Sequence, residues 1–301
     1  TGIHNAAGLS KIPFYISGLG LLLNMLLDPL FIFVLGWGTA GAAWATWISE
    51  AVVCALFVYQ LKVRKPLFGG FSFFTRLKAN YTMRILRLGL PVALLNSFFA
   101  IINLLMGRAA STYGGHIGLM TLTAGGQMEA IAWNTSQGFS TALSAFTAQN
   151  HAARRADRIQ CAYGLTLRMT MLIGALVTFL FVFYGSEIFS VIVPEQAAYE
   201  AGGVFLRIDG YSMILMMVEI STQGVFYGTG RTLPPAIISI VFNIARIPLA
   251  MVLAGAGMGV VGVWWAISLS SMLKGVVLFV WYKIITFAKE KRIEEYGNAT
   301  E

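Results

Sequence analysis

Two polar residues stand one helical turn apart in an apolar stretch near the start of the chain, and their chemistry is that of a cation site. Asn24 and Asp28 are four residues apart, so a helix places both side chains on one face. Pro29 follows at once, leaves the carbonyl of Met25 without its helical donor and favours a kink. A carboxylate, an amide and a free carbonyl on one side of a kinked helix can coordinate a cation.

A structural role for Asp28 is the alternative, because aspartate often caps a helix that has proline at its first position. The surroundings favour function. Residues 12–35 form an apolar run long enough to cross a bilayer. A carboxylate buried in hydrocarbon is costly and usually lines a pathway.

The composition is that of an integral membrane protein. Of 301 residues, 57% are hydrophobic and 11% are charged, whereas about a quarter of a soluble domain is charged. Cys54 and Cys161 have no metal-ligand spacing and predict no disulfide framework. No Ser–His–Asp arrangement, CxxC pair, Walker loop or dinucleotide fingerprint is present, so we expect no enzyme and no cofactor.

Apolar runs of spanning length predict an all-α fold with eight transmembrane helices. They cover residues 12–35, 41–61, 88–112, 119–148, 160–184, 199–227, 233–254 and 260–282.

The basic residues of the connections predict the orientation. Lys and Arg occur in every second connection, and the intervening ones, near 36–40, 113–118, 185–198 and 255–259, contain none. The positive-inside rule therefore puts both visible chain ends in the cytoplasm, with the protein in the plasma (inner) membrane. The net charge of +8 is then explained by topology and indicates no nucleic-acid partner.

A long polar connection predicts the domain boundary. Residues 63–87 mix aromatic and basic side chains, as in a linker along the inner membrane surface. Residues 1–62 would then be the last two helices of an N-terminal lobe, and residues 88–301 a six-helix C-terminal lobe with a cytoplasmic tail.

The first two spans resemble the last two. The spacing of Asn24 and Pro29 recurs in Asn243 and Pro248, at an offset of 219 residues. A second set recurs at an offset of 221, since Gly41, Trp44, Ala45 and Ser49 match Gly262, Trp265, Ala266 and Ser270. Six spans separate the starts of the two copies, so both copies have the same orientation, as in parallel-repeat transporters.

If the repeat unit is six helices, four helices are missing upstream of Thr1. We therefore expect the chain to be part of a twelve-helix transporter with two lobes.

Three stretches resemble the multidrug and toxic compound extrusion (MATE) family. They are ISGLGLLLNMLLDPLFIFVLGWGTAGAAWATWIS, GFSTALSAFTAQNHAARRADRI and GVFYGTGRTLPPAIISIVFNIARIPL. The resemblance covers essentially the whole chain, from the family's fifth helix to its twelfth. It implies a secondary transporter that exports drugs or organic cations, driven by sodium or proton movement.

The resemblance also implies site residues. The family's N-terminal cation site matches Asn24, Asp28 and Thr46, with Asp28 as the sodium ligand if sodium is the coupling ion. Glu50 lies four residues after Thr46 and shares its face.

Further candidates for a substrate cavity are Glu129, Glu219, Gln223, Asn96 and Glu50. For the two acids of the C-terminal half, the alternative is internal pairing, because buried charges are usually paired. The available bases are Arg168, Arg207, Arg246 and Lys274.

The expected activity is ion-coupled antiport by alternating access in a monomer whose partners are the bilayer and small drug-like molecules. A flippase for lipid-linked oligosaccharides is the alternative within transport, because Arg168, Arg246 and Lys274 would suit a pyrophosphate. A membrane receptor without transport is the alternative from another class.

Overall fold

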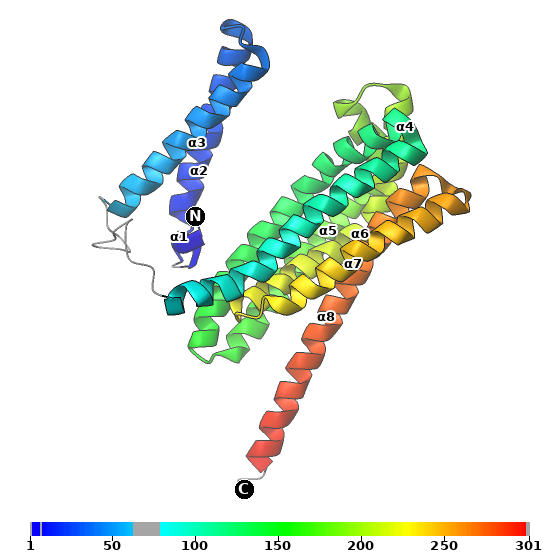
Figure 1. Ribbon diagram of the computed structural model, residues 1–301. Helices are drawn as coiled ribbons and strands as arrows, with labels where there is room; N and C mark the ends of the chain where they lie inside the picture. Colours follow the sequence, from blue (N-terminus) through cyan, green and yellow to red (C-terminus); the bar gives the residue numbers. More distant parts are fainter. Residues whose placement is uncertain (1, 7, 63–78, 299–301) are drawn as a thin grey trace. The chain divides into compact units, whose positions relative to one another are not determined.

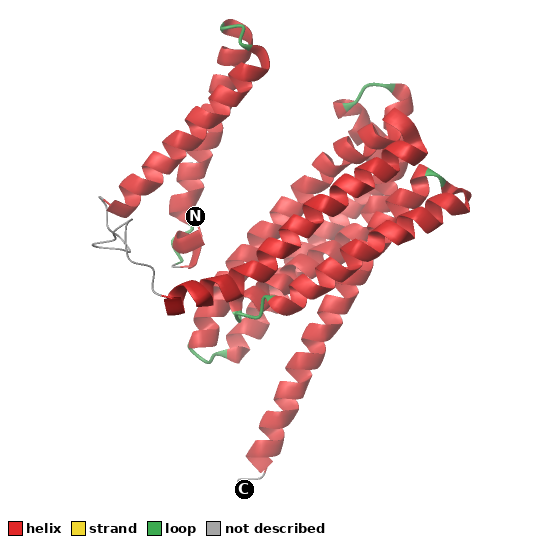
Figure 2. Ribbon diagram, in the orientation of Figure 1, coloured by secondary structure: helices red, strands yellow, loops and turns green. Residues whose placement is uncertain are grey.

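The computed structural model describes residues 2–6, 8–62 and 79–298, and within them every regular element is helical (Figure 2). The helices are α1 (Gly2–Ala6), α2 (Lys11–Pro29), α3 (Gly38–Lys62), α4 (Ala79–Ala152), α5 (Ala156–Ile192), α6 (Gln196–Gly228), α7 (Leu233–Leu253) and α8 (Val260–Asn298). Two short π-helical segments, η1 (Leu30–Val34) and η2 (Ala254–Met258), extend α2 and α7.

In the described part of the chain, seven helices are long and apolar enough to cross a membrane, where the sequence predicts eight spans. The difference lies in α4, which is interrupted at Gly115 by a backbone with φ of 60° and ψ of −148°. A Cβ at Gly118 would meet the carbonyl oxygen of Ala110. The chain therefore folds back on itself at Gly115, and the two arms of α4 are in close contact beside the turn. The two arms of α4 contain the spans predicted at 88–112 and 119–148 (Figure 1).

The chain divides into two compact units, Thr1–Thr82 and Met83–Glu301. The predicted linker at 63–87 falls largely outside the described residues, and its last part is already helical because α4 begins at Ala79. The division of the chain into lobes at this linker stays a prediction.

The first unit is a helical hairpin of α2 and α3. Gly41 is needed at its tip, because a Cβ there would lie 2.7 Å from the carbonyl carbon of Phe31. Ala45 and Ser49 are buried one and two turns further along α3. The Ser49 hydroxyl donates to the carbonyl of Ala45 over 2.8 Å, so the polar atom is satisfied within its own helix.

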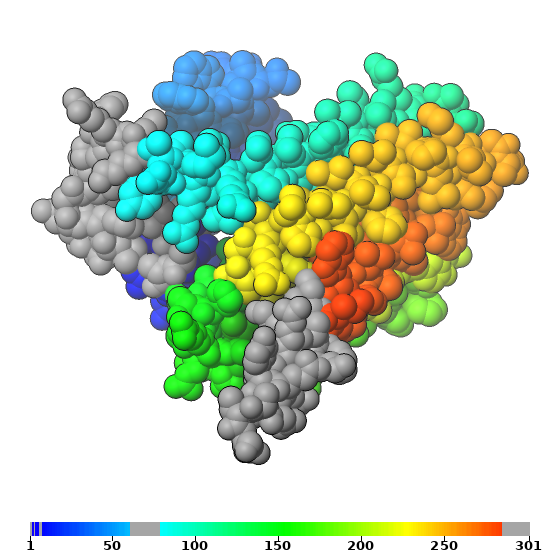
Figure 3. All heavy atoms as spheres, turned by 60° about the horizontal axis from the view of Figure 1, so that its bottom comes forward, coloured from blue at the N-terminus to red at the C-terminus, as the bar shows by residue number. Residues whose placement is uncertain are grey.

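The second unit is a helix bundle with α6 at its centre. Helix α6 is buried along most of its length, with Phe205, Met213 and Met217 in the main core. Small residues let its neighbours approach closely, as at Gly224, where a Cβ would lie 2.7 Å from the carbonyl oxygen of Ser140. The first arm of α4 lies beside α7 on one face of this unit (Figure 3).

The hairpin of α7 and α8 has the features of the hairpin of α2 and α3. A Cβ at Gly262 would lie 2.6 Å from the carbonyl carbon of Leu253, as one at Gly41 would meet Phe31. Ala266 and Ser270 are buried, like Ala45 and Ser49. A π-helical segment precedes the turn in both hairpins. The repeat found in the sequence therefore has a counterpart in local packing.

Candidate functional site

The side chains of Asn24 and Asp28 lie one turn apart on α2, and each has a buried polar atom without a partner among the described residues. These atoms are Asn24 Nδ2 and Asp28 Oδ1. A buried polar atom that makes no hydrogen bond costs free energy, so such atoms usually have an unseen partner. A carboxylate oxygen in this position can accept a proton or coordinate a cation.

The backbone changes its winding directly after Asp28 and Pro29. The π-helical segment Leu30–Val34 begins at the next residue, and the amide of Leu35 donates to the carbonyl of Leu30 over 2.9 Å. Single π-helical turns are frequent at functional sites because they redirect backbone carbonyls. The predicted irregularity at Pro29 thus takes the form of a widened turn.

Thr46 and Glu50 lie on α3 and are exposed in this unit. The Thr46 hydroxyl donates to the carbonyl of Ala42 over 3.0 Å, which leaves its lone pairs able to accept a hydrogen bond or bind a cation. Neither residue contacts Asp28 through an interaction in the described structure. The participation of Thr46 and Glu50 in a site with Asp28 stays a prediction.

In the second unit, Glu219 is buried in a polar network that joins three helices. One carboxylate oxygen lies 3.5 Å from Nζ of Lys274 on α8. The other accepts hydrogen bonds from Gln223 Nε2 at 2.9 Å and Ser239 Oγ at 3.0 Å. Internal pairing, one of the two possibilities that the sequence left open, is therefore found for Glu219, with Lys274 as the base. A contact of Glu219 or Gln223 with substrate stays a prediction.

A second network surrounds Arg246 on α7. Its Nε donates to Ser270 Oγ over 2.8 Å, and its Nη2 donates to Ser271 Oγ over 3.1 Å. The guanidinium also interacts electrostatically with Glu129, Glu219 and Asp209. Asp209, for which the sequence favours a structural role, is buried in this unit.

Glu129 lies on the inner side of the second arm of α4. Helical geometry of about 100° per residue places it about 200° from Gln127 around the axis. Its neighbours one turn away, Gly125 and Ala132, are buried. The position of Glu129 explains its electrostatic interaction with Arg246 and Lys274.

The opposite side of the same arm carries an exposed row of uncharged polar residues that the sequence reasoning missed. Thr123, Gln127, Asn134 and Thr141 follow at helical spacing, and all four are exposed. Helices α5 and α7 instead expose apolar residues, such as Leu172 at 73% and Val241 at 54%. The helical periodicity of uncharged polar residues could have revealed this row in the sequence, because it places all four residues on one face although none of them is charged.

Asn96 lies on the first arm of α4 and is exposed. Asn103 is seven residues further on, exposed, and on the same face. Both arms of α4 therefore present amide side chains away from the core of their unit.

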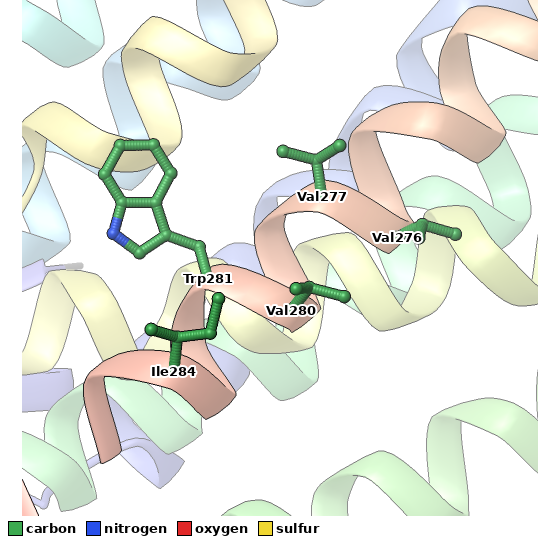
Figure 4. Close-up of a pocket in the computed structure, with 5 residues that line it drawn as sticks. All are labelled: Val276, Val277, Val280, Trp281 and Ile284. Atoms are coloured by element: carbon green, nitrogen blue, oxygen red, sulfur yellow. The ribbon is translucent and has the colours of Figure 1, made fainter. Parts of the chain in front are cut away.

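An apolar cavity of about 410 Å³ lies against α8 and is separate from these polar groups. Figure 4 shows its lining of Val276, Val277, Val280, Trp281 and Ile284. No titratable side chain lines it, so it offers shape and hydrophobic contact but no ion chemistry. In the described part of the chain, no three His, Cys, Asp or Glu side chains gather as a metal site.

Comparison with known proteins identifies the family. The model of the MatE family matches residues 90–252, more than half of the chain. This chain belongs to the MATE family. The match begins in the first arm of α4 and ends in α7, so it includes Glu219 and Arg246 but not their partners on α8.

Curated relatives extend the likeness over most of the MATE chain. It is 28% identical over 295 residues to the probable multidrug resistance protein YoeA of Bacillus subtilis, covering 92% of the chain and 62% of that relative. It is 25% identical over 276 residues to the probable multidrug resistance protein NorM of Thermotoga maritima, covering 86% of the chain and 56% of that relative. The chain thus spans about three fifths of the length of these relatives.

The fold is also that of a solved structure. A crystal structure of MATE in the straight conformation matches with a TM-score of 0.88 and 24% identity, over 96% of this chain and 65% of that one. At this identity the likeness concerns the fold, which is all-helical and membrane-spanning.

Proposed function

We propose that this chain is part of a cation-coupled antiporter that exports drugs or organic cations by alternating access. One observation carries the proposal. Asp28 lies in an apolar helix beside a π-helical turn, one turn after Asn24, and its buried Oδ1 lacks a partner among the described residues. An ionisable group with such surroundings in a membrane helix is suited to reversible ion binding.

Sodium or a proton is the coupling ion in this proposal, bound by Asp28 with Asn24 and Thr46, and with Glu50 nearby. The residues fit either ion, because a carboxylate, an amide and a hydroxyl supply the hard oxygen ligands that sodium prefers. Neutralising Asp28 removes the cost of a charge in a low-dielectric site, so ion binding can shift the balance between two conformations. Organic cations compete with the coupling ion to compensate the charge of Asp28.

The complete transporter, in this proposal, has two six-helix lobes that rock about a central cavity. The matching features of the two hairpins support a parallel repeat of this kind. The basic connections support cytoplasmic positions for both visible chain ends, in a monomer of the plasma (inner) membrane.

The exposed polar row of α4 supplies a wall for the cavity. Gln127 and Asn134 lie two turns or more from either end of the span predicted at 119–148. Amide groups at this depth are costly against lipid tails, because hydrocarbon offers no hydrogen bonds. A water-filled pathway satisfies them, so we place this face of α4 toward the substrate. Drug-like molecules would be held there by many interchangeable hydrogen bonds.

A flippase for lipid-linked pyrophosphates is less well supported. Such a substrate needs free basic groups, whereas Lys274 is paired with Glu219 and Arg246 donates to two serines. Both bases are buried, and only Arg168 of the three candidate bases is exposed. A receptor without transport gains no support from the two hairpins.

Efflux by the complete protein tests the proposal. We expect Asp28→Asn to abolish drug efflux driven by a sodium or proton gradient in proteoliposomes, because the amide cannot exchange charge. Asp157→Asn, in the exposed first turn of α5, is the matched control and should transport normally. Undiminished ion-driven efflux by Asp28→Asn refutes the proposal. Comparing the efflux driven by a sodium gradient with the efflux driven by a proton gradient identifies the coupling ion.

A further inference from the structure

Arg207 is an exposed base on α6, within the span predicted at 199–227, and the proposed function does not use it. In the described part of the chain, the one salt bridge joins Lys274 to Glu219, so Arg207 has no ion-pair partner there. Glu200 lies two turns earlier on the same face of α6, but its contact is with Gln196 Nε2 at 3.0 Å. An unpaired charge in a membrane helix is costly and indicates a functional site.

The length of α6 places Arg207 at the level of the lipid headgroups. The helix has 33 residues, which is about 50 Å, against about 30 Å of hydrocarbon in a bilayer. About 20 residues cross the hydrocarbon, so a segment that ends with the helix at Gly228 begins near Arg207. Arg231 follows in the connection on the other side of the membrane. In the proposed orientation, the guanidinium of Arg207 therefore lies among the phosphates of the outer leaflet.

An aromatic pair lies next to this base. Tyr211, one turn after Arg207 on the same face, is 46% exposed. Its ring stacks on Trp265 of α8, with the centroids 6.1 Å apart and the planes at 15°. Tyrosine and tryptophan are typical of the boundary between headgroups and hydrocarbon. Lys283 comes 18 residues after Trp265, or about 27 Å along the helix, so α8 gives the same membrane level as α6.

An apolar strip continues from the aromatic pair along α8. Leu269, Met272 and Val276 follow Trp265 at helical spacing and are at least partly exposed. Val276 is 44% exposed. The strip from Trp265 to Val276 covers 11 residues, about 16 Å, which is about half the thickness of the hydrocarbon. Its length therefore suits the acyl chain of one leaflet.

We propose that Arg207, Tyr211 and Trp265 form a binding site for an anionic phospholipid of the outer leaflet. The guanidinium binds the phosphate, and one acyl chain lies over the aromatic pair and along the apolar strip of α8. Arginine suits this ligand because its planar fork can donate two parallel hydrogen bonds to a phosphate. An anionic lipid is favoured over a zwitterionic one, since the charge of Arg207 is unopposed and a zwitterionic headgroup brings its own ammonium group.

The test measures the thermal unfolding temperature of the purified complete protein in detergent during titration with phosphatidylglycerol. Diacylglycerol with the same chains lacks the phosphate, and glycerol phosphate lacks the chains. We expect only phosphatidylglycerol to raise the unfolding temperature. Arg207→Gln should raise its half-saturating concentration about tenfold, because a charge-assisted hydrogen bond is lost.

Arg108→Gln is the matched control, since Arg108 is an exposed base near the same end of the first arm of α4. It should respond to phosphatidylglycerol like the unmodified protein. If Arg207→Gln does not fold, Tyr211→Ala takes its place and should also weaken the response, because the acyl chain loses its aromatic contact.

Four results overturn the inference. They are equal stabilisation by diacylglycerol, equal stabilisation by glycerol phosphate, an unchanged half-saturating concentration in the Arg207 variant or its replacement, and an equal weakening in Arg108→Gln. The readout requires no transport and does not involve Asp28. A failure of the proposed antiport, seen as normal efflux by Asp28→Asn, is therefore distinguishable from a failure of the lipid site.

Discussion

At the scale of residues, the acids of this chain fall into two kinds. Asp28 has a buried oxygen without a partner among the described residues, whereas Glu219 has Lys274, Gln223 and Ser239 around it. A buried charge with a complete set of partners stabilises one arrangement of the protein. A charge that lacks them is free to respond to an ion. A carboxylate therefore serves structure in the second unit and, in our proposal, coupling in the first.

Removing the partner of Glu219 should be costly. We expect Lys274→Met to lower stability by about 3–5 kcal/mol, because it leaves a buried carboxylate uncompensated. The double variant Glu219→Gln and Lys274→Met should recover most of the loss. Thermal unfolding of the purified protein measures both, with Arg168→Met, at an exposed position, as the control. A double variant as unstable as the single one would contradict the pairing.

At the scale of elements, the two arms of α4 differ from α5 and α7 in what they expose. A helix that faces lipid needs apolar side chains, because hydrocarbon cannot hydrogen-bond. The hydroxyls of Thr123 and Thr141 donate to carbonyls one turn back, which makes threonine tolerable anywhere in a membrane. Gln127 has no such bond within the described residues, and Asn134 uses only its Nδ2, toward Ala130. In our proposal, these two amides are the reason that the row faces water.

Accessibility to a membrane-impermeant maleimide tests this assignment. In a background of Cys54→Ser and Cys161→Ser, which removes both natural cysteines, Gln127→Cys and Asn134→Cys should be labelled. Addition of a transported drug should slow the labelling.

The controls are Leu172→Cys and Val241→Cys, exposed positions on the apolar faces of α5 and α7. We expect at least a tenfold lower labelling rate there, since thiols in lipid ionise poorly and meet no reagent. Equal labelling rates at all four positions would show that the polar row does not line the pathway.

At the scale of the whole molecule, the charges of the connections predict how the chain is oriented. The connection between α4 and α5 carries Arg154 and Arg155, and that between α5 and α6 carries no base. The two connections lie at opposite ends of α5, a helix of 37 residues. They must therefore face opposite sides of the membrane.

Labelling of intact cells checks this orientation. In the same cysteine-free background, Glu195→Cys should react with an impermeant maleimide from outside, and Arg154→Cys should react only after the membrane is permeabilised. The reverse pattern would invert the topology and place the chain ends outside.

The sequence alone determined the helical class and the positions of the long apolar helices, and it revealed the repeat, because each depends on local composition and spacing. Hydrophobic runs predict helices in lipid whatever their neighbours are, and Gly41 and Gly262 mark close turns by spacing alone. The sequence also singled out Asp28 and Asn24, since a four-residue interval suffices to put both on one face.

Only the tertiary structure decided which charges are paired. Glu219 and Lys274 are far apart in the sequence, and four bases were available to each acid before the helices were packed. Which side of the second arm of α4 is covered, that of Glu129 or that of Gln127, likewise depends on how the neighbouring helices pack. Pairing and exposure are properties of packed helices, and no single helix contains them.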